Sequence, residues 1–219
     1  MSAGPIGIFG GTFNPVHNGH LRSALELRER LALEQVRLLP AARPPLRGEP
    51  ELTAELRAEM VELAVASEPG LVCDRRELFR QGPSYTVETL AELRAELGPS
   101  RSLCLIVGSD ILERLSDWHR WQELLDFAHL VVMARPGWRA PNSGLIATWV
   151  EGNSGSVADL KDSPAGRVVM QELRQLPISA TEIRDMIAAG QSPRYLLPDA
   201  VWAVSYTHLT LPTTLPRCR

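Results

Sequence analysis

Short apolar runs alternate along this chain with segments of helical periodicity, and no other feature constrains the fold as strongly. Strands that are apolar on both faces, each followed by a helix, are typical of an α/β fold with a doubly wound parallel sheet. The predicted strands are Ile6–Phe9, Val36–Leu39, Leu71–Cys73, Leu103–Val107 and Leu130–Met133. The predicted helices are Gly19–Leu33 with Asn18 as N-cap, Thr53–Ser67, Val87–Leu97 and a helix after Ser179 that ends near Gly190.

Length and composition predict one domain over residues 1–204. The chain has 219 residues, is 44% hydrophobic and carries a net charge of −3, so it offers no strongly basic surface for nucleic acid. Its three cysteines, Cys73, Cys104 and Cys218, fit neither a disulfide framework nor a zinc ligand set. The sequence leaves the oligomeric state open, a homo-oligomer included.

Two features predict a cytoplasmic protein that does not enter a membrane. No stretch approaches the ~18 apolar residues of a membrane span. The opening residues, Met1–Pro5, lack the basic region and apolar core of a signal peptide. The segment from Gly137 to Gly166 is rich in Gly, Ser, Asn and Pro, and we expect a surface excursion there with a short strand at Ala147–Val150.

The stretch "IFGGTFNPVHNGH", Ile8 to His20, has the composition of a phosphate site. A strand that ends in Gly10 and Gly11 leaves bare backbone at the carboxyl edge of the sheet, where ligands of open α/β sheets bind. The helix that follows directs its N–H groups and the positive end of its dipole to the same place. His17 and His20 can donate hydrogen bonds to phosphate oxygens there. A tight turn with capping histidines is the structural alternative.

Two common phosphate-binding motifs are absent from this stretch. It contains neither the G-x-G-x-x-G of dinucleotide-binding domains nor the G-x-x-x-x-G-K-[ST] of P-loops. A NAD-dependent dehydrogenase is therefore the weakest of the functions that we consider.

The same stretch resembles the signature of the nucleotidylyltransferase superfamily, H-x-G-H at a strand–helix turn, met by His17, Gly19 and His20. A second superfamily motif, I-S-x-T-x-I-R, is met by "ISATEIR", residues 178–184. The resemblance implies a Rossmann-like fold and an ATP site. The residues implied for ATP are Gly10, Gly11, Thr12, Phe13, Gly19, Ser179 and Thr181, with His17, His20 and Arg184 as the catalytic phosphate ligands. Ser179 can also serve only as a helix cap, in a capping box with Glu182.

Three middle segments, "GPSYTVETL", "VGSDILERLSDWHRW" and "HLVVMARPGW", resemble the nicotinate-nucleotide adenylyltransferases. That resemblance spans Ile6 to Val204. It implies that Tyr85 and Thr86 lie beside the nicotinate, with backbone N–H groups that can meet its carboxylate. Trp118 would offer an indole face to the pyridinium ring, a contact worth ~0.5–2 kcal/mol. Core packing is the alternative for Tyr85 and Trp118, and the favoured interpretation for Trp121.

The remaining implied contacts lie at other strand ends. Gly108 and Asp110 would approach the adenosine, and Arg135 would reach the nucleotide from the end of its strand. The loop that reads P-x-N-x-P-P-H-K in the family reads "PAARPPLR" here, so Ala42 and Leu46 replace polar residues. Arg47 replaces the lysine and can still bind a substrate phosphate, bidentately.

The resemblance implies transfer of the adenylyl group of ATP to nicotinate mononucleotide, with Mg²⁺ held mainly through ATP. The acceptor phosphate has its second pKa near ~6, so it is a dianion at neutral pH and needs no general base. We assign no residue as a metal ligand. Two alternatives stay open: a sister transferase that acts on nicotinamide mononucleotide, a phosphopantetheine arm or a cytidylyl acceptor, and a non-catalytic nucleotide-binding module.

From Ser205 the family pattern stops. The last residues read "SYTHLTLPTTLPRCR", with two prolines, four threonines and no acidic residue. This composition predicts neither a helix nor an amphipathic strand. We interpret 205–219 as a non-family tail of cloning or reading-frame origin, and expect residues 206–219 to pack poorly.

Overall fold

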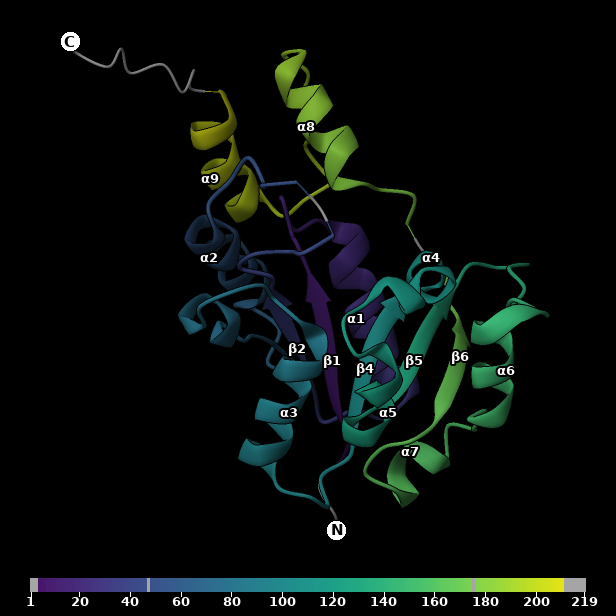
Figure 1. The fold of residues 1–219 in the computed structure, drawn as a ribbon. Helices are drawn as coiled ribbons and strands as arrows, with labels where there is room; N and C mark the ends of the chain where they lie inside the picture. Colours follow the sequence, from purple (N-terminus) through teal and green to yellow (C-terminus); the bar gives the residue numbers. More distant parts are fainter. Residues whose placement is uncertain (1–3, 47, 175, 211–219) are drawn as a thin grey trace.

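A computed structural model describes residues 4–46, 48–174 and 176–210, with side chains as far as Ser205. Within these residues, six strands form one parallel sheet in the order β3-β2-β1-β4-β5-β6 (Figure 1). The strands are β1 (Ile6–Gly11), β2 (Gln35–Pro40), β3 (Leu71–Cys73), β4 (Leu103–Gly108), β5 (His129–Ala134) and β6 (Val168–Glu172). The predicted doubly wound α/β fold is confirmed.

Helices cover both faces of the sheet, with α3 and α5 on one face and α1 and α2 on the other (Figure 1). The helices are α1 (Asn18–Arg30), α2 (Ala54–Val65), α3 (Thr86–Leu97), α4 (Ser109–Glu113), α5 (Leu124–Phe127), α6 (Gly144–Gly152), α7 (Asp159–Asp162), α8 (Ala180–Ala188) and α9 (Asp199–Thr210). Single 3₁₀ turns are η1 (Arg76–Phe79), η2 (Leu115–Asp117) and η3 (Trp121–Glu123). No helix of the described segments is long and apolar enough to cross a membrane.

Two apolar cores form because successive strand side chains point to opposite faces. On β1, Ile8 belongs to the core beneath α3 and α5, and its neighbour Phe9 belongs to the core beneath α1 and α2. β4 alternates in the same way, with Leu105 in the first core and Ile106 in the second. The continuous apolar runs of the sequence therefore fill both layers.

The order of the strands reverses between β1 and β4, and there the pairing is incomplete. β1 pairs with β2 along its whole length, up to Gly11 opposite Pro40. With β4 it pairs only from Ile6 to Ile8, which lies opposite Leu105. The carboxyl ends of β1 and β4 are thus not joined by this ladder. A switch point of this kind is where open α/β sheets bind ligands.

Two expectations drawn from local pattern are wrong, and one strand was missed. The segment at Ala147–Val150 is helical, in α6, because Ile146 packs into the core and Trp149 meets Trp121 edge to face, at 5.2 Å between ring centroids. Strand β6 was not predicted, and its pairing with β5 makes it an ordinary member of the sheet. The N-cap of α1 is His17, and Asn18 is the first residue of the helix.

The tail also differs in part from expectation. Helix α9 continues through Ser205 to Thr210, where the composition predicted no helix, and Ser205 is fully buried. Helix α9 follows Pro198, carries Asp199 in its first turn and buries Val201, so the helix starts well before the unusual residues. The prediction of poor packing for 206–219 concerns side chains and residues outside the described part.

Candidate active site

The candidate site residues gather at the carboxyl edge of the sheet. Because all strands run parallel, the segments that follow them emerge at the same edge. Gly10 and Gly11 end β1, Gly108 ends β4, and Arg135 directly follows β5. The second motif follows β6 and forms the start of α8. The fold thus brings to one edge the two motifs that lie far apart in the sequence.

The two adjacent glycines of the first motif have different surroundings. A Cβ placed on Gly11 would meet the Phe13 ring at 3.0 Å, so Gly11 is required by the fold of the loop itself. A Cβ placed on Gly10 would meet no described protein atom within 4 Å, and Gly10 is exposed. No protein neighbour accounts for a glycine there, so close approach of a ligand to the backbone is its best explanation.

His17 is buried at the start of α1, and only 5% of its surface is exposed. Its Nδ1 atom has no hydrogen-bond partner among the described residues. Burial lowers the pKa of this imidazole from 6.5 to about 4, so it is neutral at pH 7. A neutral imidazole with an unpartnered nitrogen can donate to or accept from a bound ligand.

His20 is held against His17. The two rings are stacked with 3.7 Å between their centroids, and Nδ1 of His20 accepts from the backbone N–H of His17 at 3.3 Å. Phe13, whose φ is +49°, packs edge-on against His20 at 5.1 Å. A Cβ on Gly19 would lie 3.0 Å from Nδ1 of His17. The H-x-G-H spacing therefore has a steric reason, because Gly19 leaves room for the His17 ring.

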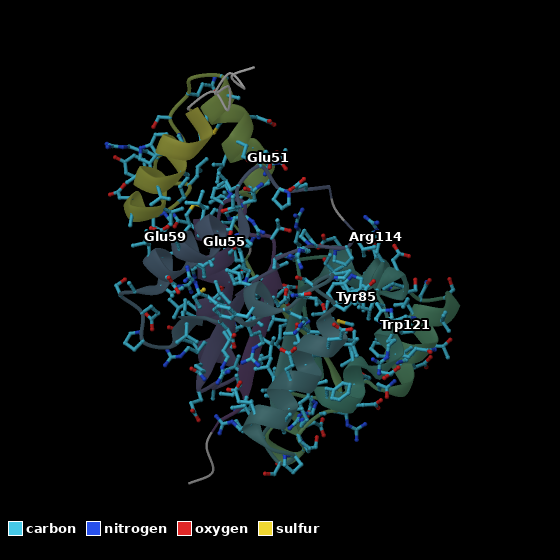
Figure 2. The ribbon with its side chains drawn as sticks, turned by 60° about the vertical axis from the view of Figure 1, so that its left-hand side comes forward. Glu51, Glu55, Glu59, Tyr85, Arg114 and Trp121 are labelled. Carbon is cyan, nitrogen blue, oxygen red and sulfur yellow. The ribbon has the colours of Figure 1, made fainter. Side chains whose placement is uncertain are left out.

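Arg184 joins the second motif to the first. From α8 its guanidinium donates to the backbone carbonyl of Asn14 at 2.9 Å, and its Nε lies 3.1 Å from a carboxylate oxygen of Glu51. Glu51 is labelled in Figure 2. Glu51 also accepts from the Asn14 side chain. Burial alone would raise the pKa of the Glu51 carboxyl, but a backbone hydrogen bond and the pairing with Arg184 and Asn14 lower it overall. The Glu51 carboxylate therefore already pairs with Arg184, the cation that is predicted to bind phosphate.

Ser179 and Thr181 lie at the start of α8. Ser179 is the N-cap, and its hydroxyl accepts from the N–H of Glu182 at 3.1 Å. Both residues are exposed, in keeping with a surface that a nucleotide can reach. The capping role of Ser179 is confirmed, and its role as a phosphate ligand stays a prediction.

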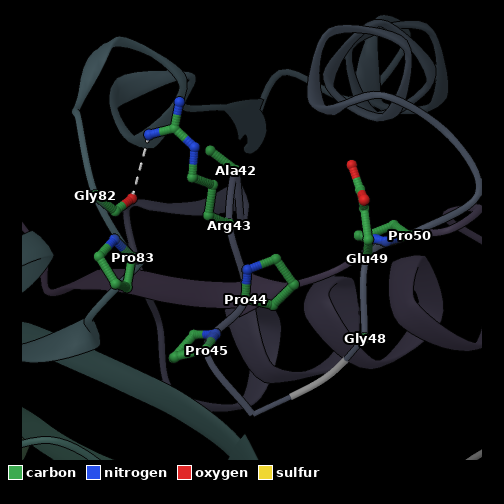
Figure 3. Close-up of a pocket in the computed structure, with 9 residues that line it drawn as sticks. All are labelled: Ala42, Arg43, Pro44, Pro45, Gly48, Glu49, Pro50, Gly82 and Pro83. Carbon is green, nitrogen blue, oxygen red and sulfur yellow. Dashed lines mark hydrogen bonds between the residues drawn. The ribbon is translucent and has the colours of Figure 1, made fainter.

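A groove of about 460 Å³ lies between the loop after β2 and the loop before α3 (Figure 3). Its lining includes Ala42, Pro44, Pro45 and Pro83, together with Arg43. The Arg43 guanidinium points to the Gly82 carbonyl, at 3.4 Å, and its backbone N–H donates to the Ser84 hydroxyl at 3.1 Å. The two loops are therefore tied together over a proline-rich floor. Arg47, predicted to bind substrate here, lies outside the described residues.

The predicted nicotinate contacts lie at the start of α3. Tyr85 is the N-cap of α3 and Thr86 its first residue. The backbone N–H of Tyr85 was expected to meet the nicotinate carboxylate, but it donates to the Pro83 carbonyl at 3.0 Å and is therefore paired within the turn. N–H groups of a first helical turn have no acceptor within the helix, which leaves Thr86 as the better donor for a carboxylate. The Tyr85 ring stacks on His119, at 4.2 Å.

The two tryptophans of the "DWHRW" segment are buried to different extents. Trp121 is 9% exposed and packs into the core with Trp149, which confirms its structural role. Trp118 is half-buried against the same core, and the neighbouring His119 is exposed. Trp118 can therefore still present part of its surface to a ligand.

The predicted adenosine contacts lie on the far side of the switch point. Gly108 is the N-cap of α4, and a Cβ on it would overlap a carboxylate oxygen of Asp110. The Asp110 side chain therefore folds back over the end of β4. Arg135 is exposed at the end of β5. These residues share the carboxyl edge of the sheet with the histidines.

Sequence reasoning missed several residues of this edge. Glu51, Arg43, His119 and Arg57 are in contact with predicted site residues or their loops. Each acts through a partner distant in sequence. Arg43, inside the altered "PAARPPLR" loop, and His119, inside the "DWHRW" segment, lie in family segments that could have drawn attention to them, whereas Glu51 and Arg57 lie in no quoted motif.

Comparison with known proteins identifies the family. The cytidylyltransferase-like family model matches residues 8–186. A "probable nicotinate-nucleotide adenylyltransferase" of Cellvibrio japonicus is 50% identical over 197 residues, which cover 90% of this chain and 93% of that protein. A protein of the same name from Halorhodospira halophila is 51% identical over 197 residues, which cover 90% of each.

A solved structure agrees with this fold. The nicotinic acid mononucleotide adenylyltransferase of Plasmodium falciparum, complexed with NaAD, superposes with a TM-score of 0.69 and covers 94% of this chain and 96% of that one. At 12% identity this likeness shows the fold alone. The family itself rests on the family model and on the sequence relatives: this chain is a member of the cytidylyltransferase-like enzymes and, among them, of the nicotinate-nucleotide adenylyltransferases.

Proposed function

We propose that this chain transfers the adenylyl group of ATP to nicotinate mononucleotide, releasing pyrophosphate and forming nicotinate adenine dinucleotide. The observation that carries this proposal is the stacked His17–His20 pair at the start of α1, beside the open backbone of Gly10. Imidazole donors, helix N–H groups and bare backbone at a switch point suit a triphosphate.

The reaction is an in-line displacement at the α-phosphorus of ATP. An oxygen of the acceptor phosphate forms a bond to this phosphorus, and the bond to the bridging oxygen breaks as pyrophosphate leaves. The acceptor phosphate is mostly a dianion at neutral pH, so no protein group has to remove a proton. The protein's contribution is then positioning and electrostatic stabilisation of the charge that develops.

The histidines and Arg184 supply different parts of that stabilisation. His17 is neutral before ATP binds, because burial lowers its pKa to about 4, and it acts first as a hydrogen-bond donor or acceptor. A polyphosphate nearby raises the pKa of an imidazole, so positive charge on His17 grows with the ligand. Arg184 is a permanent cation, and it becomes available to phosphate oxygens when Glu51 moves away.

A magnesium ion would be held mainly by the triphosphate. In the described residues no group of three His, Cys, Asp or Glu side chains could hold a metal ion. Mg²⁺ often keeps several waters and binds through substrate phosphates, which suits a site rich in donors and cations. When bound it would neutralise part of the charge on the leaving pyrophosphate.

The groove beside α3 is the candidate acceptor site. Its proline floor suits a flat pyridinium ring, and Arg43 and the first turn of α3 offer positive potential to a carboxylate. An amide in place of the carboxylate would direct its NH₂ group at donors, which weakens binding. These features support nicotinate over nicotinamide.

The test is pyrophosphate release from ATP and Mg²⁺ with nicotinate mononucleotide, nicotinamide mononucleotide and phosphopantetheine in parallel. We expect a strong preference for nicotinate mononucleotide. Pyrophosphate release with another acceptor would support the ATP site and contradict the assignment of nicotinate mononucleotide as the acceptor. Binding of ATP without release for any acceptor would favour a non-catalytic nucleotide-binding module.

A further inference from the structure

Arg57 is the largest side chain that the fold buries completely, and only 1% of its surface is exposed. It lies in the first turns of α2, at the carboxyl edge of the sheet. Its guanidinium donates to three main-chain carbonyls: Leu52 at 3.1 Å, Thr12 at 2.6 Å and Ala42 at 3.3 Å. Among the described residues it forms no ion pair. Glu55 and Glu77 attract its charge from a greater distance, but its close contacts are carbonyls, and a buried arginine held in this way calls for an explanation.

The three carbonyls belong to three segments that adjoin the candidate site. Thr12 lies between Gly11 and Phe13, in the loop predicted to meet ATP. Ala42 lines the acceptor groove. Leu52 directly follows Glu51, the residue that pairs with Arg184 and Asn14. One side chain therefore connects the ATP loop, the acceptor loop and the segment next to the phosphate cation.

We propose that Arg57 is a positioning residue for adenylyl transfer: its buried guanidinium holds the loop after β1 and the loop after β2 in a fixed relation, so that ATP and the acceptor phosphate meet in line. The proposal rests on the proposed function and deepens it. The hydrogen bonds that the Arg57 side chain forms within the described residues go to backbone carbonyls, so it acts through Thr12 and Ala42 and needs no contact with substrate.

The geometry requires a guanidinium. Arginine presents five N–H donors in a rigid planar fork, which can meet three separated carbonyls at once. A lysine keeps the charge and most of the stem, but its single nitrogen cannot reproduce contacts made by Nε, Nη1 and Nη2. The Arg57→Lys variant should therefore fold, but the loops after β1 and β2 should be imperfectly aligned.

Arg94 is a matched control within the same molecule. From α3 its guanidinium also donates to main-chain carbonyls, those of Gly98 at 3.0 Å and Pro164 at 2.9 Å among them. These carbonyls precede β4 and β6, at the amino edge of the sheet, away from every candidate site residue. Burial lowers the pKa of both arginines. The two residues thus share the same kind of contact and differ in the edge of the sheet where they make it, and Arg94 is half-buried where Arg57 is fully buried.

The experiment compares Arg57→Lys and Arg57→Met with Arg94→Lys and Arg94→Met in the full-length protein. Thermal unfolding measures stability, and steady-state pyrophosphate release at a temperature where each variant is folded gives kcat and both KM values. We expect all four variants to lose thermal stability. Only the Arg57 variants should lose turnover, by up to about 10²-fold as for misplacement by about 1 Å, with a raised KM for nicotinate mononucleotide.

The proposal would be overturned if Arg57→Lys lost as much stability as Arg94→Lys but kept the wild-type kcat and KM. Arg57 would then have only a structural role. If Arg57→Met does not fold, Arg57→Lys alone decides. ATP affinity by calorimetry adds a readout without turnover, and it should weaken severalfold in Arg57→Lys and stay unchanged in Arg94→Lys. A wild-type protein that binds ATP but releases no pyrophosphate would refute the proposed function. In that case the ATP affinities of Arg57→Lys and Arg94→Lys would still show whether Arg57 positions the ATP loop.

Discussion

The carboxyl and amino edges of the sheet each bury a histidine, and the two histidines have different partners. His129, at the amino edge, is fully buried, and its ring nitrogens meet the Ser163 carbonyl at 2.9 Å and the Arg167 N–H at 3.2 Å. His17, at the carboxyl edge, is almost as buried, yet its Nδ1 has no partner in the described residues. Burial lowers the pKa of both imidazoles.

We interpret this difference as one between a histidine that holds the fold and a histidine that is available to the proposed ligand. A buried polar atom with protein partners on every side stabilises one conformation. A buried polar atom without a partner costs free energy unless something else satisfies it, and such atoms are uncommon. The arginines do not divide by edge in this way: Arg184 pairs with the exposed carboxylate of Glu51, whereas Arg94 at the amino edge and Arg57 at the carboxyl edge are both held by main-chain carbonyls.

The largest effect on turnover is expected when a histidine at the carboxyl edge of the sheet is replaced. His17→Ala and His20→Ala should each lower kcat by about 10²-fold or more, as for the loss of a transition-state donor, while the protein still folds. The matched variant His129→Gln should lower the melting temperature and leave kcat within about twofold, because its partners are structural. Near-normal turnover in a His17 or His20 variant would remove that residue from the proposed mechanism.

Stability against pH should distinguish His17 next. The unfolded chain binds a proton at His17 near pH 6.5, whereas the native state resists it down to about 4. The unfolded state thus binds more protons in this window, and stability falls as the pH is lowered through it. Between pH 7 and pH 5 the loss from His17 is about 2 kcal/mol, at about 1.4 kcal/mol per pKa unit.

Urea unfolding at several pH values measures this effect. His17→Gln should have a flatter dependence than the wild type, with the residual slope left to groups such as His129, whose lowered pKa acts in the same direction. An unchanged slope in His17→Gln would show that His17 is not held neutral by burial.

A pair of glycines in β1 sharpens the comparison further. At Gly10 a Cβ meets no described protein atom, so Gly10→Ala should unfold like the wild type but raise the KM for ATP about tenfold, a cost of about 1.4 kcal/mol. At Gly7 a Cβ meets Leu33 and Val36 at 3.0 Å, so Gly7→Ala should cost about 1–3 kcal/mol of stability and spare the KM. Thermal unfolding and ATP kinetics on both variants check this. An unaltered KM in Gly10→Ala would leave its glycine unexplained.

The smallest effect is expected at Glu51. Glu51→Gln removes the anion that lies on Arg184, so ATP should bind a few times more tightly, in line with the modest energy of exposed ion pairs. Calorimetric titration with ATP tests this, and Glu62→Gln is a matched control, since Glu62 pairs with Arg75 on a similarly exposed surface. Weaker ATP binding in Glu51→Gln would mean that the carboxylate supports the site.

Much of the fold and the core of the site could be read from the sequence. Residues 6–9 and 103–107 are recognisable as strands because β-structure buried on both faces needs continuous apolar runs. His17, Gly19 and His20 are adjacent in sequence and meet within one helical turn, so their association is local. Helix α6 was not recognised, since its β-branched and aromatic residues favour a strand and its helical state depends on contacts such as Trp149 with Trp121.

The sequence by itself determined the parallel α/β architecture and the two phosphate motifs, because periodicity and local motifs depend on residues close in the chain. Only the tertiary structure decided how buried His17 is, that Glu51 covers Arg184, and that Arg57 ties Thr12 to Ala42. These properties depend on contacts between segments far apart in the chain, such as Arg57 and Thr12, which are 45 residues apart, and no local pattern specifies them. The motifs identify which side chains are candidates for the reaction, and the long-range contacts determine the charge and the position of those side chains.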